Sequence, residues 1–212
     1  IKVSCTITKR RRPASVGACW HMYSEVRKMV KLDQVRHVVT LHEGASVSIV
    51  GTSVTVSGAE QSITRDFSHK KVNVSEVEGS IIVQCDLPRR KEKAIAGTWR
   101  AHLTNMVTGV TEGFEYRLKA VYSHFPMSLS VNGNTFQINN LFGEKVPRKA
   151  DLKWTPSDVQ VRVENKVDVI VTGADREKVG QTAAIIERAC RIRRRDRRVF
   201  QDGIYITQKG KN

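Results

Sequence analysis

The feature that most constrains the fold is an order of strands and helix that occurs twice along the chain. In its first occurrence, apolar and polar residues alternate over 47–56 and again over 72–85, each time around a glycine-containing turn. This alternation predicts two β-hairpins. Apolar residues spaced by three and four over 95–110 then predict a helix, and alternation over 116–122 predicts a strand that closes this unit.

The same order returns in the second half. Hairpins are predicted over 129–138, around Asn132-Gly133, and over 159–171. A helix capped by Asp175 follows, and a closing strand is predicted at 204–206. The apolar face of this helix consists of Val179, Ala183, Ile186 and Cys190. The copies are offset by roughly 80–90 residues. We therefore predict an α+β fold, a tandem duplication of a small unit in which one helix packs on a mainly antiparallel sheet.

The predicted division has three parts. Residues 1–28 form a basic N-terminal extension, 29–125 the first α+β unit, and 126–212 the second unit with a basic C-terminal segment. Three interpretations of the extension stay open: a mitochondrial transit peptide, a disordered basic arm, or an upstream stretch that cells do not translate.

Charge and composition narrow the classes of function. The chain has 36 Lys and Arg against 21 Asp and Glu, a formal net charge of +15, which points to a polyanionic partner such as nucleic acid. No apolar run approaches the roughly 18 residues that cross a bilayer, so no membrane partner is expected. The 4 cysteines follow no regular spacing, which favours a reducing compartment such as the cytoplasm over a disulfide-bonded secreted domain.

Two clusters of cations are the candidate RNA-binding residues. The denser one runs off the end of the second predicted helix, where guanidinium groups suit contacts with phosphates and bases. It consists of Arg188, Arg191, Arg193, Arg194, Arg195, Arg197 and Arg198. Pro147 and Pro156 bracket most of the second cluster, which predicts an exposed loop. It consists of Lys145, Arg148, Lys149 and Lys153, and Lys209 and Lys211 extend the charge to the C-terminus.

Aromatic residues on the apolar stripes are expected in the core rather than on RNA. They are Trp99, Tyr116, Tyr122 and Phe136, whereas Trp154, beside a predicted turn, is an RNA-facing candidate.

Motifs for catalysis, cofactors and metals are missing from the sequence. Glycine, lysine and threonine over 173–182 do not follow the order of a phosphate-binding loop. Cys19 and His21 have no second pair of zinc ligands, and the remaining histidines show no spacing typical of a catalytic triad. We therefore expect no catalytic residues, no metal, no cofactor and no small-molecule substrate.

Four segments carry a resemblance to a known family. They are Asn105–Phe114 with the following Tyr116 and Val121–Pro126, Arg65–Phe67, Asn140–Lys145 and Asp202–Tyr205. Together they resemble the archaeal and eukaryotic branch of the ribosomal protein L6 family, over nearly everything from about Met29 to Gly210.

The resemblance implies a duplicated domain and a structural role in the large subunit of cytoplasmic ribosomes. It implies binding to ribosomal RNA near the sarcin–ricin loop, with translation factors and other ribosomal proteins nearby. The expected contacts are the loop with Gly143-Glu144-Lys145 and the C-terminal segment through Gly203 and Lys209. The arginine-dense run 191–198 departs from the family pattern, and it is either an additional RNA contact or a face toward another ribosomal protein.

Two other classes of function stay open from the sequence. One is an RNA-modifying enzyme with a basic domain, and the other is a regulatory RNA-binding module that acts apart from the ribosome.

Overall fold

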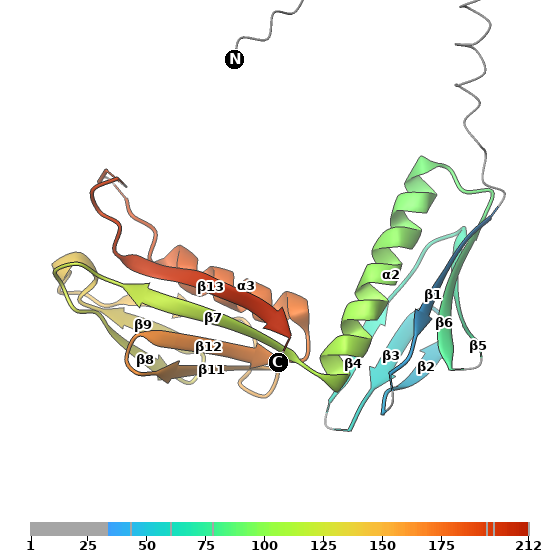
Figure 1. Ribbon diagram of the computed structural model, residues 1–212, viewed down its shortest axis with the longest axis horizontal. Coiled ribbons are helices and arrows are strands. Elements are labelled where there is room, and N and C mark those ends of the chain that lie inside the picture. Colours follow the sequence, from blue (N-terminus) through green and yellow to red (C-terminus); the bar gives the residue numbers. More distant parts are fainter. Residues whose placement is uncertain are drawn as a thin grey trace, which may run out of the picture. The chain divides into compact units, whose positions relative to one another are not determined.

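Figure 1 shows the computed structural model of the chain, which describes residues 34–42, 44–59, 61–77, 79–193, 195–196 and 198–211. The extension predicted at 1–28 lies outside the described residues, as do Arg194 and Arg197, and of Lys211 only the backbone is described. Contacts place Gln34–Asn212 in one unit, which contains both copies of the predicted strand and helix order.

The first group of strands forms two three-stranded antiparallel sheets, of order β1-β6-β5 and β2-β3-β4. Their bounds are β1 Gln34–Thr40, β2 Ser46–Val50, β3 Ser53–Ser57, β4 Ser62–Asp66, β5 Val72–Val77 and β6 Ser80–Asp86. The pairs β2–β3 and β5–β6 are the two predicted hairpins. Strands β1 and β4 were not predicted.

Helix α2, Arg90–Thr111, packs on β1 and β6. At its start the Glu92 carboxylate accepts a hydrogen bond from the backbone N–H of Arg89, which satisfies one of the donors that a helix start leaves free. Two residues past its end Gly113 has a φ of 76°, the left-handed conformation that terminates many helices. The predicted apolar stripe faces the core, with Trp99, Leu103 and Met106 buried.

The second group repeats this arrangement with one additional strand. A three-stranded sheet of order β10-β9-β8 accompanies a four-stranded sheet of order β11-β12-β7-β13, and all pairs are antiparallel. The bounds are β7 Phe114–Val121, β8 Ser128–Asn132, β9 Thr135–Asn139, β10 Arg148–Asp151, β11 Val159–Glu164, β12 Asp168–Gly173 and β13 Gly203–Lys211. A short 3₁₀ turn, η1, spans Leu141–Gly143.

Helix α3, Arg176–Ala189, lies on the four-stranded sheet (Figure 1). The Asp175 carboxylate accepts a hydrogen bond from the backbone N–H of Glu177 at 2.8 Å, as expected of an N-cap. The four residues of the predicted apolar face are all buried. The α+β class and the duplication are thus confirmed.

Strand β7 has different partners from those the sequence predicted. It was expected to close the first unit, but it pairs with β12 on one side and β13 on the other, both from the second half. Its buried residues Phe114, Tyr116 and Leu118 belong to the core under α3. Alternation revealed a strand with one buried face, but it carried no information about which sheet the strand would join. The proposed boundaries of the units at 29–125 and 126–212 stay a prediction.

Two predictions about single residues also need comment. Tyr122 was expected in the core, but it is 41% exposed, because β7 ends at Val121 and the chain then leaves the sheet. Trp154 packs against the core of the second group and is only partly exposed, so it offers less surface to RNA than expected.

Candidate nucleic-acid interface

Arg148, at the start of β10, joins the two predicted clusters of cations. Its guanidinium donates two hydrogen bonds to the Glu144 carboxylate, at 2.7 and 2.8 Å. It also donates to the backbone carbonyls of Ala189 and Arg191, at 3.2 and 3.0 Å. These carbonyls lie at and just after the end of α3, where the helix leaves acceptors without partners and where its dipole favours a cation. Arg148 therefore fixes the loop after η1 to the beginning of the arginine run.

Two aromatic rings fix the far end of the same run. Phe142 in η1 contacts Phe200 edge-on, with ring centroids 5.9 Å apart. The Arg195 guanidinium lies over both rings, 5.5 Å from the centroid of Phe142 and 5.1 Å from that of Phe200. Cation–π contacts of this geometry hold a guanidinium in place while leaving its edge free for other ligands. Phe142 itself has a φ of 53°, an uncommon conformation for a residue with a large side chain.

The structure thus brings the two predicted clusters together, although not in the form that the sequence suggested. Residues 148–151 form β10, paired with β9, so the predicted loop is in part a strand. Arg148 itself is turned to the intramolecular partners above, and its side chain is 23% exposed. The described members of the two clusters that are exposed are Lys145, Lys149, Lys153, Arg188, Arg191, Arg193, Arg195 and Arg198.

The C-terminal candidates lie on β13. Lys209 is exposed, whereas Gly203 is buried and is placed to act only through its backbone and by leaving room for neighbours. Before it, the buried Asp202 accepts hydrogen bonds from the backbone N–H and the hydroxyl of Ser123, each at 3.1 Å. This contact joins the segment after the arginine run to the segment that follows β7.

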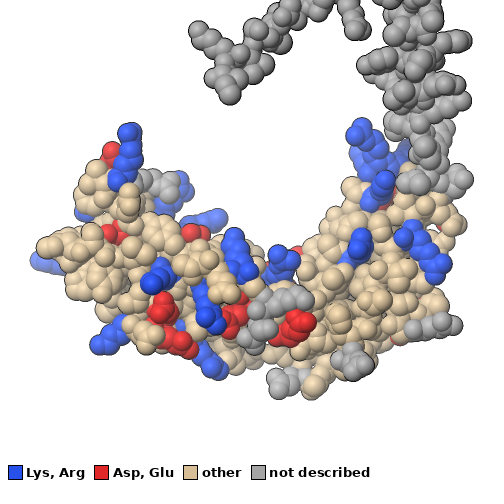
Figure 2. Space-filling model, in the orientation of Figure 1, with Lys and Arg blue, Asp and Glu red and all other residues tan. Residues whose placement is uncertain are grey.

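In this view the exposed cations form groups separated by neutral and acidic surface and not one continuous patch (Figure 2). One group stands at the projecting tip formed by the arginine run, where Figure 1 shows the loop between α3 and β13.

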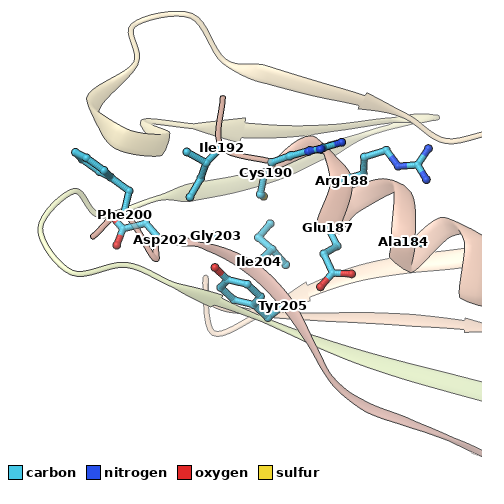
Figure 3. Close-up of a pocket in the computed structure, with 11 residues that line it drawn as sticks. Ala184, Glu187, Arg188, Cys190, Ile192, Phe200, Asp202, Gly203, Ile204 and Tyr205 are labelled. Atoms are coloured by element: carbon cyan, nitrogen blue, oxygen red, sulfur yellow. The ribbon is translucent and has the colours of Figure 1, made fainter. Parts of the chain in front are cut away.

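A hollow of about 460 Å³ lies between the end of α3 and β13 (Figure 3). Cys190 and Ile204 contribute its buried surface, and burial raises the pKa of the Cys190 thiol to about 11, so it is neutral at physiological pH. Tyr205 and Phe200 are exposed at its edge. No sequence pattern marked this hollow, since it forms from residues of α3, the following loop and β13.

A second cluster that the sequence did not reveal joins β4, α2 and α3. The Arg65 guanidinium donates to both oxygens of Glu177, each at 3.0 Å, and its Nη1 lies 3.1 Å from Nδ1 of His102. Hydrogen bonds from Arg65 hold the pKa of Glu177 below its usual value despite partial burial. Arg65 belongs to the segment Arg65–Phe67 that carried part of the resemblance, and that segment was the available signal.

Chemistry other than binding finds no support among the residues that the structure describes. These residues contain no group of three or more His, Cys, Asp or Glu placed to hold a metal ion. Cys19 and His21 lie outside the described range. Neither described helix combines the length and the hydropathy needed to span a membrane.

Comparison with known families settles which family this fold belongs to. The sequence profile of "Ribosomal protein L6" matches residues 42–113 and 125–203, one segment for each copy of the repeated order. The chain belongs to the ribosomal protein L6 family. The L6 match includes the loop after η1 and the whole arginine run, and it ends at Gly203, so Lys209 lies beyond it.

Archaeal members of the L6 family are similar over most of the chain. Proteins named "Large ribosomal subunit protein uL6" from Methanosphaera stadtmanae and Methanobrevibacter smithii are 45% and 42% identical over 181 residues, covering 85% of this chain and 97% and 99% of their own lengths. The protein of that name from Ignicoccus hospitalis is 46% identical over 183 residues, covering 84% of this chain and 96% of its own length.

Proposed function

We propose that the chain is a structural constituent of the large subunit of cytoplasmic ribosomes, where it binds ribosomal RNA and supports translation without catalysing a reaction. Membership of the L6 family and the name shared by its similar relatives support this assignment. Other ribosomal proteins are its remaining partners, and they contact the faces of the chain that RNA does not cover.

The observation that carries the proposal is the fixed presentation of the arginine run. Arg148 ties its beginning to the loop after η1, and the rings of Phe142 and Phe200 hold Arg195 near its end. Cations held on a rigid support lose little conformational freedom when they meet phosphates, so binding retains more of the electrostatic free energy. A regulatory module or an enzyme would need, in addition, a feature that separates it from the ribosome or a reactive site.

The finer part of the proposal concerns the position on the subunit. We infer that the second group of strands contacts RNA near the sarcin–ricin loop, beside the site where translation factors bind. The support is the resemblance of Asn140–Lys145 and Asp202–Tyr205 to the family, since both segments adjoin the arginine run in the fold. The proposed contacts are Lys145, Lys149, Lys153, Arg188, Arg191, Arg193, Arg195, Arg198, Gly203 and Lys209, with Arg148 as a positioning residue.

The test replaces three exposed arginines of the run, Arg191, Arg193 and Arg198, by glutamine. Each lost phosphate contact lowers the slope of log affinity against log salt by about 0.7–0.9. The triple variant therefore dissociates from large subunits at lower salt in sucrose gradients, and its slope for binding large-subunit RNA falls by about 2–3.

A matched control neutralises three exposed cations elsewhere in the second group, Lys119, Arg162 and Lys166. This variant loses the same formal charge and should stay bound at the salt concentration that releases the first. Equal release of the two variants would mean that net charge, and not the arginine run, holds the protein. Chemical cross-linking from Lys145 and Lys149 to RNA, followed by sequencing, tests the finer position.

A further inference from the structure

The hollow beside the arginine run is bordered by exposed aromatic rings, which phosphate binding alone does not require. Tyr205 is 42% exposed and Phe200 is 38% exposed, although nonpolar rings at a surface gain nothing from water. Both rings are fixed: the Tyr205 hydroxyl donates to the carbonyl of Gln201 at 2.8 Å, and Phe200 packs against Phe142. Fixed, exposed rings beside guanidinium groups are the surfaces on which unpaired RNA bases stack.

Three charged groups around the hollow have no partner within the described part of the chain, whereas a fourth, Asp202, is bound by Ser123. The guanidinium groups of Arg188 and Arg191 and the carboxylate of Glu187 form no ion pair or hydrogen bond with another described residue. Figure 3 shows the Glu187 carboxylate directed to the same side as Tyr205, while the Arg188 side chain extends away from that ring. Of the two carboxylates that line the hollow, Asp202 is held by Ser123 and Glu187 is unpaired. One unpaired acceptor on the side of the ring, with cations farther out, matches a base flanked by phosphates.

We propose that this hollow binds one unpaired nucleotide of ribosomal RNA, whose base stacks on Tyr205 while its flanking phosphates contact Arg188 and Arg191. The volume of about 460 Å³ lies in the range of about 300–1,000 Å³ typical of ligand pockets. The Cys190 and Ile204 side chains supply a neutral, apolar floor for the base. This inference rests on the proposed function, because it names the form of RNA that the arginine run recognises.

Glu187 gives the site a preference among bases. A carboxylate only accepts hydrogen bonds, so it pairs with the exocyclic amino group of adenine, cytosine or guanine. Uracil has carbonyl oxygens in place of this amino group, so it can donate to the carboxylate only through its N3–H. The hollow should therefore disfavour an unpaired uridine.

The test uses the full chain and two RNA hairpins, identical except that one carries a single unpaired adenosine in its stem. We expect the bulged hairpin to bind about tenfold more tightly than the paired one, which corresponds to the stacking of one base. Tyr205→Ala should remove this difference and leave binding to the paired hairpin unchanged, whereas Tyr205→Phe, which keeps the ring, should retain it. Equal binding of both hairpins by the unaltered chain overturns the proposal.

A second variant keeps the test decisive if Tyr205→Ala does not fold. Glu187→Gln lies at a half-buried helix position and adds a donor, so it should bind a uridine bulge as well as an adenosine bulge, while the unaltered chain prefers adenosine severalfold. An unchanged preference in this variant contradicts the assigned role of the carboxylate and the placement of the base.

The outcome also separates this inference from the proposed function. Salt-dependent binding to the paired hairpin without preference for the bulge would contradict only the proposed nucleotide site. Loss of association with large subunits would contradict the proposed ribosomal function. A photoreactive residue at position 205 in intact ribosomes provides the last arm. An adduct with one RNA nucleotide supports the proposal, and an adduct with a neighbouring protein overturns it.

Discussion

Replacing Arg148 by methionine tests the support of the arginine run. The change keeps the apolar stem of the side chain and removes hydrogen bonds to one carboxylate and two backbone carbonyls, at 2.7–3.2 Å. A hydrogen bond to a charged group contributes about 1.5–3 kcal/mol to the free energy of unfolding. Removing one partner lowers the stability further when the other partner stays buried without a hydrogen bond. Since the side chains of Arg148 and Glu144 are 23% and 36% exposed, water compensates part of this. We expect a loss of about 2–4 kcal/mol in the free energy of unfolding.

Urea denaturation of the purified chain measures this loss as a lower midpoint at unchanged slope. In thermal unfolding each kcal/mol corresponds to about 2–4 °C for a chain of this size, so the midpoint should fall by about 5–15 °C. Arg148→Lys keeps the charge but not the planar fork of donors. Its unfolding midpoint should therefore lie between those of the unaltered chain and Arg148→Met. Binding to RNA should weaken even where the variant is fully folded, because the beginning of the run is no longer tied to the loop.

The matched control is Arg117→Met on β7, which removes another arginine that pairs with a glutamate, Glu115. The Arg117 side chain is 57% exposed, so this variant should leave the urea midpoint nearly unchanged. A double-mutant cycle of Arg148→Met with Glu144→Gln should show coupling, since the two groups share two hydrogen bonds. If Arg148→Met were no more destabilising than Arg117→Met, the reasoning about the support would be refuted.

Four other predictions concern Glu144, Gly97, Gly109 and Cys190. Hydrogen bonds from Arg148 lower the pKa of Glu144 below its ordinary value of 4.5, so the pair stabilises the fold above that pH and its contribution fades as the pH falls further; the stability difference between the unaltered chain and Glu144→Gln should shrink accordingly in acid titrations. In α2, Gly97→Ala should raise the free energy of unfolding by about 0.5–1 kcal/mol, because its Cβ meets nothing within 4 Å. Gly109→Ala, in the same helix, should lower it by about 1–3 kcal/mol, since its Cβ would lie 2.0 Å from the carbonyl oxygen of Ala174; denaturation curves with the same sign for both would contradict this. The Cys190 thiol, with burial raising its pKa to about 11, should resist alkylation at pH 8 until the chain unfolds, and rapid modification of the folded chain, read by mass spectrometry, would argue against its buried position.

Much of the fold could be predicted because apolar periodicity records burial directly. The hairpins at β2–β3 and β5–β6 and both helices have a buried stripe or face, so their patterns stand out in the sequence. Strands β4, Ser-Ile-Thr-Arg-Asp, and β10, Arg-Lys-Ala-Asp, lack such a pattern. They are edge strands of small sheets with few buried side chains, so pairing with a neighbour, and not their own composition, makes them strands.

The candidate site shows a similar division. Composition identified the cations, because charge is a property of the sequence alone. It did not distinguish Arg148 from Lys149, the next residue, although one is tied to four acceptors and the other is exposed. That difference depends on the alternation of faces along β10 and on the return of α3 to this edge. The hollow at Tyr205 has the same origin, since its walls come from three segments.

The position of β7 decides where the polypeptide can be divided. This strand lies between β12 and β13 and hydrogen-bonds to both. A fragment that begins at Pro126 would lack β7, so β12 and β13 would each lose the strand that pairs with them in this sheet. A fragment that begins at Phe114 keeps every strand of that sheet. The hydrogen bonds of β7 thus assign this strand to the second group, and a cut that leaves its sheet intact has to fall ahead of Phe114.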